Sequence, residues 1–210
     1  NLRRTLPLSL QTRLVLVVSA VLCAGGMAAI LALEWDNPFS LSPMPLGEKL
    51  LTAWFHSVSA RTAGFNTIDM SGLQPTTLFI VMALMFIGAS PGGTGGGVKT
   101  TTFSVTVAAL WATIRGDDDT AIFRRRLPDT LVAQAFFICL ISFLALNAVA
   151  LLLMILEPYE ILKILFESAS AFGTVGLSVG HPGSVLSLSG HMADGAKLLV
   201  ALLMIAGRVG

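Results

Sequence analysis

The stretch GASPGGTGGGVKTTT, residues 88–102, decides how the rest of the chain is interpreted. Six glycines stand among its first ten residues, and Lys99 follows them. A phosphate-binding Walker A loop reads G-x-x-x-x-G-K-[ST], with the lysine directly after the last glycine. Here Val98 separates Gly97 from Lys99, so the lysine is displaced by one residue. This displacement weakens the phosphate-loop hypothesis. The sequences on either side of the stretch are needed to decide whether it binds phosphate.

The flanks and the overall composition indicate a membrane protein. Uncharged apolar runs lie on both sides of the stretch, at 76–87 and 102–114. Hydrophobic residues make up 54% of the chain and charged residues only 12%, whereas a soluble globular domain has about 25% charged residues. We therefore expect an all-α, multi-pass protein of the cell membrane. The formal net charge of +1 gives no reason to expect a nucleic-acid partner.

The distribution of basic residues predicts the orientation in the membrane. Most arginines precede the first apolar run or lie in the one long polar connection: Arg3, Arg4, Arg13, Arg115, Arg124, Arg125 and Arg126. By the positive-inside rule, the N-terminal end and the 115–129 connection are expected to be cytoplasmic. Cys23 and Cys139 both lie inside apolar runs and are expected to be packing residues. Because the chain has no initiator methionine and stops inside an apolar run, we expect a fragment of a longer protein.

The chain contains an internal repeat. A long apolar run, a polar break, a short amphipathic stretch, a glycine-bearing turn and a second apolar run occur twice in the same order. Residues 55–60 align with 166–171, and 84–88 align with 203–207. Polar and glycine positions match as well as apolar ones, which argues against coincidence. Repeats in a membrane chain indicate pseudosymmetric packing around an axis.

The short stretch 48–60 cannot cross a bilayer, because a spanning helix needs about 20 residues. We expect it to enter the membrane and return as a re-entrant helix. Lipid cannot satisfy the backbone of the turn that follows, so that turn must be buried in protein or line a water-filled path. Such turns can present carbonyl oxygens that replace the hydration shell of a monovalent cation. The absence of carboxylates in both turns makes a divalent ion the weaker hypothesis.

Four motifs in order resemble the Trk/Ktr/HKT superfamily of potassium uptake proteins, with the Ktr-type membrane subunit most similar. They are RTAGFNT at 61–67, GASPGGTGGGVKTTT at 88–102, FGTVGLS at 172–178 and GRVG at 207–210. The resemblance implies four units of span, re-entrant pore helix, filter loop and span around one pore. This chain resembles the third and fourth units only. The remaining two units of the same protein are therefore implied partners.

The resemblance also implies the boundaries of these units. The third repeat would occupy 1–115, with a span at 12–34, a pore helix at 48–60, a filter at 61–67 and a broken span at 75–115 that contains the glycine loop 88–98. A cytoplasmic linker would occupy 116–128. The fourth repeat would occupy 129–210, with a span at 129–156, a pore helix at 160–171, a filter at 172–178 and a truncated span at 192–210.

The implied site is a potassium filter above a gate. The filter residues would be Thr62, Ala63, Gly64, Phe65, Thr174, Val175, Gly176 and Leu177. The gate loop would comprise Gly88, Ala89, Ser90, Pro91, Gly92, Gly93, Thr94, Gly95, Gly96 and Gly97, with Lys99. The flanking segments are each too short to span alone, which places this loop at mid-depth. Arg208 follows the glycine that matches Gly88, so we expect it to donate hydrogen bonds to the loop carbonyls.

Several further polar residues are expected to support this site. His56 and its near-counterpart Glu167 are expected to be satisfied behind the filter, without binding the ion. Arg61 is expected to donate to backbone carbonyls at the end of the pore helix. The acidic residues 117–119 and the basic residues 124–126 form a charged cytoplasmic loop that is either merely solvated or a contact for a regulatory subunit. No Ser-His-Asp grouping or carboxylate pair suggests catalysis, so we expect no enzyme.

Two functions remain open at this point. The first is a potassium pathway, with potassium as the substrate, sodium as the expected activator and no cofactor in this chain. The second is a membrane-embedded enzyme or pump subunit that uses 88–102 to bind phosphate or nucleotide. The displaced lysine and the doubled filter motif favour the first. The Ktr resemblance implies a homodimer on a cytoplasmic ring of nucleotide-binding regulatory subunits.

Overall fold

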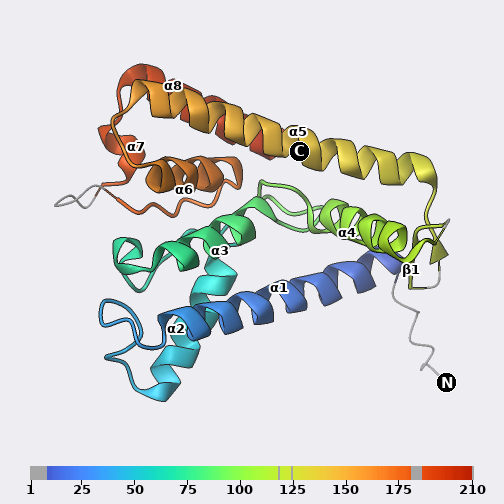
Figure 1. Cartoon of the computed structure of the whole chain (residues 1–210), viewed down its shortest axis with the longest axis horizontal. Helices are drawn as coiled ribbons and strands as arrows, with labels where there is room; N and C mark the ends of the chain where they lie inside the picture. The colour runs from blue at the N-terminus through green and yellow to red at the C-terminus, as the bar shows by residue number, and fades with distance from the viewer. Residues whose placement is uncertain (1–8, 118, 124, 181–185, 210) are drawn as a thin grey trace.

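The computed structural model describes residues 9–117, 119–123, 125–180 and 186–209. Their regular structure is helical apart from one two-stranded hairpin and one isolated bridge, so the expected all-α class is confirmed (Figure 1). Arg3, Arg4 and Arg124, on which part of the orientation argument depends, lie outside the described residues.

The helices follow one another in the order expected from the repeat. Their bounds are α1 (Leu10–Glu34), α2 (Leu46–Ser59), η1 (Met70–Gly72), α3 (Pro75–Phe86), α4 (Thr100–Arg115), α5 (Asp129–Leu156), α6 (Ile161–Phe172), α7 (Leu188–His191) and α8 (Asp194–Val209). The hairpin pairs β1 (Ala121–Ile122) with β2 (Arg125–Arg126). Among the described residues, two helices are long and apolar enough to cross a membrane, α1 with 25 residues and α5 with 28.

Local signals explain where these helices begin and end. The Ser9 hydroxyl accepts a hydrogen bond from the Thr12 amide at 3.1 Å and so caps the start of α1. Pro75 occupies the first turn of α3, where its missing N–H costs nothing. Gly116 ends α4 in the left-handed conformation, with φ of +74°. The helices on either side of the glycine loop, α3 and α4, therefore have ordinary helix boundaries.

A buried glutamate ties the end of α1 to the start of α3. The Glu34 carboxylate is fully buried and accepts hydrogen bonds from Asn37 Nδ2 at 2.5 Å and from Ser40 Oγ at 2.6 Å. Its other oxygen accepts from the Gln74 amide at 2.9 Å and from the Thr77 hydroxyl. Amides at a helix N-terminus lack partners within their helix, and here Glu34 supplies the acceptor.

The second half of the chain repeats this arrangement with one described hydrogen-bond donor. Glu157 follows α5 directly, is buried, and accepts from the Ala193 amide at 2.6 Å, immediately before α8. In both halves, a glutamate at the end of the long helix thus caps the next apolar helix. The capping role of both glutamates was not predicted from the sequence, because an acidic residue in a polar segment between apolar runs is normally exposed to solvent.

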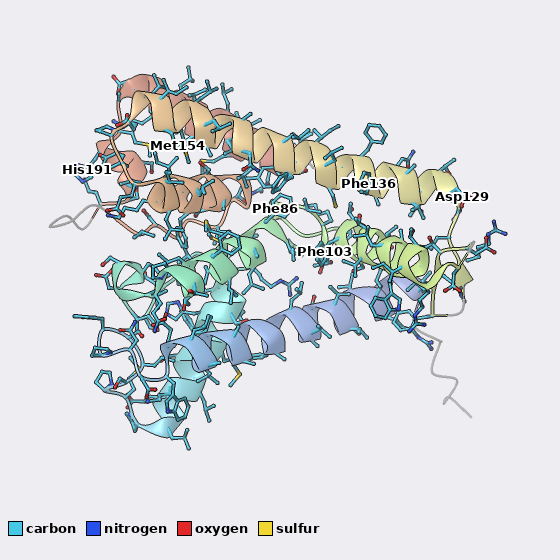
Figure 2. All side chains as sticks on the ribbon, in the orientation of Figure 1. Phe86, Phe103, Asp129, Phe136, Met154 and His191 are labelled. Atoms are coloured by element: carbon cyan, nitrogen blue, oxygen red, sulfur yellow. The ribbon has the colours of Figure 1, made fainter. Side chains whose placement is uncertain are left out.

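The two halves of the chain lie side by side, with the glycine loop between them. In Figure 1, α1 and α2 lie below, α5, α6 and α8 above, and the green segment from α3 through the loop to α4 runs between them. The halves pack together through α3 against α6 and α4 against α5. Phe86 occupies this junction, where its ring stacks on Phe172 with centroids 5.7 Å apart and meets Phe143 edge-on at 6.4 Å (Figure 2).

The two ends of the molecule differ in charge. The start of α1, the end of α4 and the β1–β2 hairpin lie at one end, near Asp129 in Figure 2. Arg126 there pairs with Asp119 at 2.7 Å. The opposite end carries α7 and His191 (Figure 2). Four of the six described arginines therefore lie at the hairpin end: Arg13, Arg115, Arg125 and Arg126.

Candidate functional site

The first glycine turn, residues 61–67, is held by a serine at the end of α2. The Ser59 carbonyl accepts from the amides of Ala63 and Gly64 at 3.0 and 3.1 Å. Its hydroxyl accepts from the Phe65 amide at 2.8 Å and also contacts the Phe65 carbonyl oxygen. Thr62 and Gly64 both have φ of +76°. The left-handed conformation costs a threonine energy, and such strain concentrates at functional sites.

The second glycine turn, residues 172–178, has the same construction. The Ser170 carbonyl accepts from the Val175 amide at 2.9 Å, and its hydroxyl accepts from the Gly176 amide at 3.1 Å. Thr174 and Gly176 have φ of +49° and +96°. Each of the short helices α2 and α6 therefore has, near its C-terminal end, a buried serine that accepts hydrogen bonds from the turn. These serines belong to the aligned segments, but the sequence did not reveal that they accept from the turn amides.

His56 and Glu167 hold the segments that leave the two turns. His56 Nε2 lies 3.2 Å from Thr67 Oγ1 and accepts from the Thr67 amide at 3.3 Å. Glu167 accepts from the Ser178 hydroxyl at 2.7 Å and from the Ser189 amide at 3.0 Å. Both side chains reach a residue 11 positions later. They hold the segments after the turns. Glu167 is satisfied as expected, whereas His56 is satisfied only at Nε2, because its Nδ1 is buried without a hydrogen-bond partner among the described residues.

The two glycine turns meet each other. A Cβ atom added to Gly64 would overlap the carbonyl oxygen of Val175 and would lie 3.4 Å from the Cα of Gly176. The absence of a side chain at Gly64 is therefore what permits the close approach. Turns separated by more than one hundred residues in the sequence thus form a single feature of the molecule.

The glycine loop, residues 88–98, folds back so that its two ends lie side by side. Ile87, directly before the loop, and Val98, at its end, form an isolated parallel bridge. Six of its amides already donate to protein oxygens, those of Gly88, Ala89, Gly93, Gly96, Gly97 and Val98. A phosphate-binding loop needs such amides to converge on its ligand. The phosphate hypothesis for 88–102 therefore has no geometric support.

The glycine loop presses against the threonine of each turn. The Gly96 amide donates to Thr174 Oγ1 at 2.9 Å. A Cβ atom on Gly95 would lie 2.5 Å from Thr62 Oγ1, and one on Gly96 would lie 2.7 Å from Thr174 Oγ1. Side chains at these two positions would displace the loop from the turns. Gly95 and Gly96 are therefore needed for close contact between the loop and the two threonines.

Two cations contact the carbonyls of the glycine loop. Lys99 is half-buried, and its Nζ donates to the Gly95 carbonyl at 2.7 Å. Arg61 lies 3.5 Å from the Gly88 carbonyl oxygen and 3.4 Å from that of Ser19. The expectation that Arg61 donates to carbonyls at the end of its own helix is therefore wrong. Its side chain reaches across to α1 and the loop, because the turn directs it away from the end of α2.

Arg208 does not contact the glycine loop in this structure, which corrects the expectation that it donates to the loop carbonyls. Its side chain is exposed, and among the described residues no hydrogen bond or ion pair involves it. The Gly207 carbonyl accepts from the Gly97 amide at 3.0 Å instead. Successive residues of a helix point about 100° apart, so the helix face that meets the loop at Gly207 turns Arg208 away.

A cavity lies beyond the glycine loop, toward the hairpin end. It has a volume of about 310 Å³ and lies between α1, α4 and α5. Its lining is mainly apolar but includes Gln11, Thr101 and Gln134. The loop therefore separates the two glycine turns from a hollow at the other end of the molecule.

A family model described as TrkH, cation transport protein, matches residues 2–210 of this chain. The chain belongs to the TrkH family. It is 35% identical over 208 residues to the Ktr system potassium uptake protein B of Bacillus subtilis, which covers 99% of this chain and 45% of that protein. The protein of the same name from Vibrio alginolyticus is 34% identical, over 97% of this chain and 43% of its own length. The expected resemblance to Ktr-type subunits is confirmed.

Two further TrkH-family comparisons bear on the fold and on the length. The potassium/sodium uptake protein NtpJ of Enterococcus hirae is 33% identical over 99% of this chain and 45% of its own length. The crystal structure of the potassium transporter TrkH from Vibrio parahaemolyticus matches with a TM-score of 0.74 at 19% identity, over 95% of this chain and 42% of that one. This match shows a shared fold. The chain spans less than half the length of these relatives.

Proposed function

We propose that this chain forms half of the wall of a potassium pathway across the cell membrane, with the glycine loop as its gate. The observation that carries the proposal is the contact of one loop with both glycine turns through Thr62 and Thr174. The names of two relatives, both potassium uptake proteins, are the reason for choosing potassium as the ion.

Backbone carbonyls of the two glycine turns would coordinate potassium. Left-handed residues alternate along each turn, at Thr62 and Gly64 and again at Thr174 and Gly176. Rings of backbone carbonyls replace the hydration shell of potassium in known filters. The buried serines at the ends of α2 and α6 would hold the backbone in this shape, so that the turns do not collapse when the ion leaves.

The glycine loop would close the pathway below the filter. Its hydrogen bonds to Thr174 and Gly207 fix it to the second half of the chain. Lys99 adds a positive charge beside the loop, which disfavours a cation there while the loop is in place. Movement of the loop toward the cavity between α1, α4 and α5 would open the path.

The orientation and the assembly are also proposals. The hairpin end carries four of the six described arginines, and we place it in the cytoplasm by the positive-inside rule. That end would then meet the nucleotide-binding regulatory subunits that a Ktr-type system implies, with Asp119 and Arg126 as exposed charges. Homodimerisation and activation by sodium belong to the same proposal. The name of the potassium/sodium uptake relative is consistent with a role for sodium.

The test is potassium uptake by cells that cannot otherwise take up potassium, normalised to the amount of protein inserted in the membrane. Deletion of 92–95 removes the middle of the glycine loop and should raise the uptake rate while the preference for potassium over sodium is kept. A lasting loss of selectivity would mean that the loop is part of the filter. An unchanged uptake rate with normal insertion would show that the loop is not the barrier.

A further inference from the structure

The two glycine turns are backed by buried side chains of different chemistry. His56 in α2 is 2% exposed, and Glu167 at the matching position of α6 is 6% exposed. Residues of this chain already cover both side chains, so the difference between them does not depend on what packs against the outer faces of the molecule. An imidazole therefore lies behind the first turn and a carboxyl group behind the second.

Hydrogen bonding assigns His56 as neutral. The Thr67 amide lies 3.3 Å from His56 Nε2 and can only donate a hydrogen bond, so Nε2 has to accept it and carries no proton. Nδ1 has no hydrogen-bond partner among the described residues. A cationic imidazole would need an acceptor at each nitrogen, and here one nitrogen faces a donor. This position therefore places no charge behind the first turn.

Hydrogen bonding at Glu167 suits the ionised form. The Ser178 hydroxyl oxygen accepts from the amides of Gly180 and Leu188 at 3.1 and 3.0 Å. Its own hydrogen is left to bond Glu167 Oε2, 2.7 Å away. The Ser189 amide donates to Oε1 at 3.0 Å, so donors meet both oxygens, as an ionised carboxylate requires. No ion pair among the described residues neutralises this charge.

The Glu167 carboxylate lies close enough to the second turn to act on an ion there. Ser178 follows Gly176 by two residues, and consecutive Cα atoms are about 3.8 Å apart. Through its hydrogen bond to Ser178, the carboxylate is therefore at most about 13 Å from the Gly176 Cα. At an effective dielectric constant of about 20, one charge at this range changes the occupancy of a monovalent ion about tenfold.

The other charges beside the turns do not replace this carboxylate. Arg61 directly precedes the first turn, and Lys99 donates to the glycine loop, so both would repel a cation. Asp69 follows the first turn by two residues but is exposed, so that solvent and salt screen its charge. Glu167 is therefore the buried anion that offsets the two cations.

Helix dipoles do not account for the difference between the turns. α2 ends at Ser59 and α6 ends at Phe172, each just before a turn. The C-terminal end of a helix carries a partial negative charge, and both turns receive it. The full charge of Glu167 is thus an addition that the first turn lacks.

We propose that Glu167 sets the affinity of the potassium pathway for its ion, by placing one negative charge behind the second turn where the first turn has none. The inference deepens the proposed function and rests on it. The carboxylate does not touch the ion, and its field acts on ionic charge alone. Backbone carbonyls of the turns would choose among ions of equal charge. Affinity and selectivity would therefore be set by different groups.

Potassium uptake by the full-length protein, in cells that lack other potassium uptake, tests this assignment. Glu167→Gln should raise the KM for K⁺ and for Rb⁺ by the same factor, between several-fold and about tenfold, with a smaller change in the maximal rate. The preference for K⁺ over Na⁺ should stay. Asp69→Asn is the matched control, because it removes the same charge from an exposed position, and it should leave KM within about twofold.

Inhibition by Ba²⁺ separates an effect of charge from a change in the shape of the turn. Ba²⁺ carries twice the charge of K⁺, so Glu167→Gln should raise its inhibition constant by the square of the factor found for the KM of K⁺. A distorted turn has no reason to follow this relation. Equal factors for K⁺ and Ba²⁺, or a changed preference for K⁺ over Na⁺ at constant KM, would overturn the proposal.

The matching positions of His56 and Glu167 also allow the charge to be added or exchanged. His56→Glu should lower both constants. Combined with Glu167→His it should return the KM for K⁺ toward the parent value, because the charge is moved to the first turn. His56→Glu keeps the test decisive where Glu167→Gln does not insert. Unchanged KM in both single variants, beside normal uptake by the parent, overturns this inference alone, whereas a parent that takes up no potassium overturns the proposed function.

Discussion

The amide nitrogen of Gly96 lies 2.9 Å from Oγ1 of Thr174, 78 residues further along the chain. This hydrogen bond joins the glycine loop to the second glycine turn. In the proposed pathway, the hydroxyl oxygen that accepts it would also be a ligand for potassium at the inner mouth of the filter. Release of the loop would then free this oxygen for the ion and so couple the position of the loop to the state of the filter.

Thr174→Val should weaken the hold on the glycine loop, because valine keeps the shape of threonine but cannot accept the Gly96 hydrogen bond. A net hydrogen bond contributes about 1 kcal/mol, so the open fraction should rise about fivefold. The measurement is potassium uptake per inserted protein. Thr62→Val is the matched control, because Thr62 touches the loop at Gly95 without a described hydrogen bond to it. Equal uptake by both variants would contradict the coupling.

Gly176→Ser should lower the preference for potassium over sodium while insertion stays normal. The nearest atom to a Cβ at Gly176 is 4.0 Å away, so the side chain has space, but φ of +96° strains any residue other than glycine. Gly64→Ser should behave differently and also reduce the amount of folded protein, because its Cβ would overlap the Val175 carbonyl oxygen. Competition between the two ions for uptake measures the preference. Unchanged selectivity in both variants would remove the turns from the filter.

Lys99→Met should raise potassium uptake, because it removes a charged donor from the Gly95 carbonyl and a positive charge from beside the loop. A hydrogen bond to a charged group contributes about 1.5–3 kcal/mol, which predicts an increase of about tenfold or more in the open fraction. Lys99→Arg keeps the charge and should change uptake less. Arg208→Ala is a second control and should leave the loop in place. A larger increase in uptake from Arg208→Ala than from Lys99→Met would show that Arg208, and not Lys99, keeps the loop in place.

Glu34→Gln should destabilise the fold by roughly 3 kcal/mol. The glutamine side chain replaces one acceptor oxygen by an NH2 group, whose hydrogens would face protein groups that donate hydrogen bonds to the carboxylate. The donors are Asn37, Ser40, Gln74 and Thr77. Thermal unfolding of purified protein in detergent measures the loss. Glu157→Gln is the matched control in the second half, where one described amide donates, and its unfolding temperature should fall less. Equal losses would mean that the extra donors of Glu34 do not contribute.

The sequence by itself determined the class of protein, the order of the helices and the positions of the glycine turns and the glycine loop. These features depend on local properties. Apolar runs longer than a bilayer requires indicate spanning helices, short runs indicate helices that do not span, and glycine marks backbone that needs positive φ. Gly64 and Gly176 were found from their motif, and both have positive φ.

Only the tertiary structure decided which of these features touch. The contact of Gly96 with Thr174, the cap that Glu34 provides for α3, and the distance of Arg208 from the loop all depend on helix rotation. One residue of rotation moves a side chain by about 100°, so neighbours such as Gly207 and Arg208 point in different directions. Hydropathy and motifs locate a residue along a helix, whereas its partners are set by packing between segments far apart in the chain.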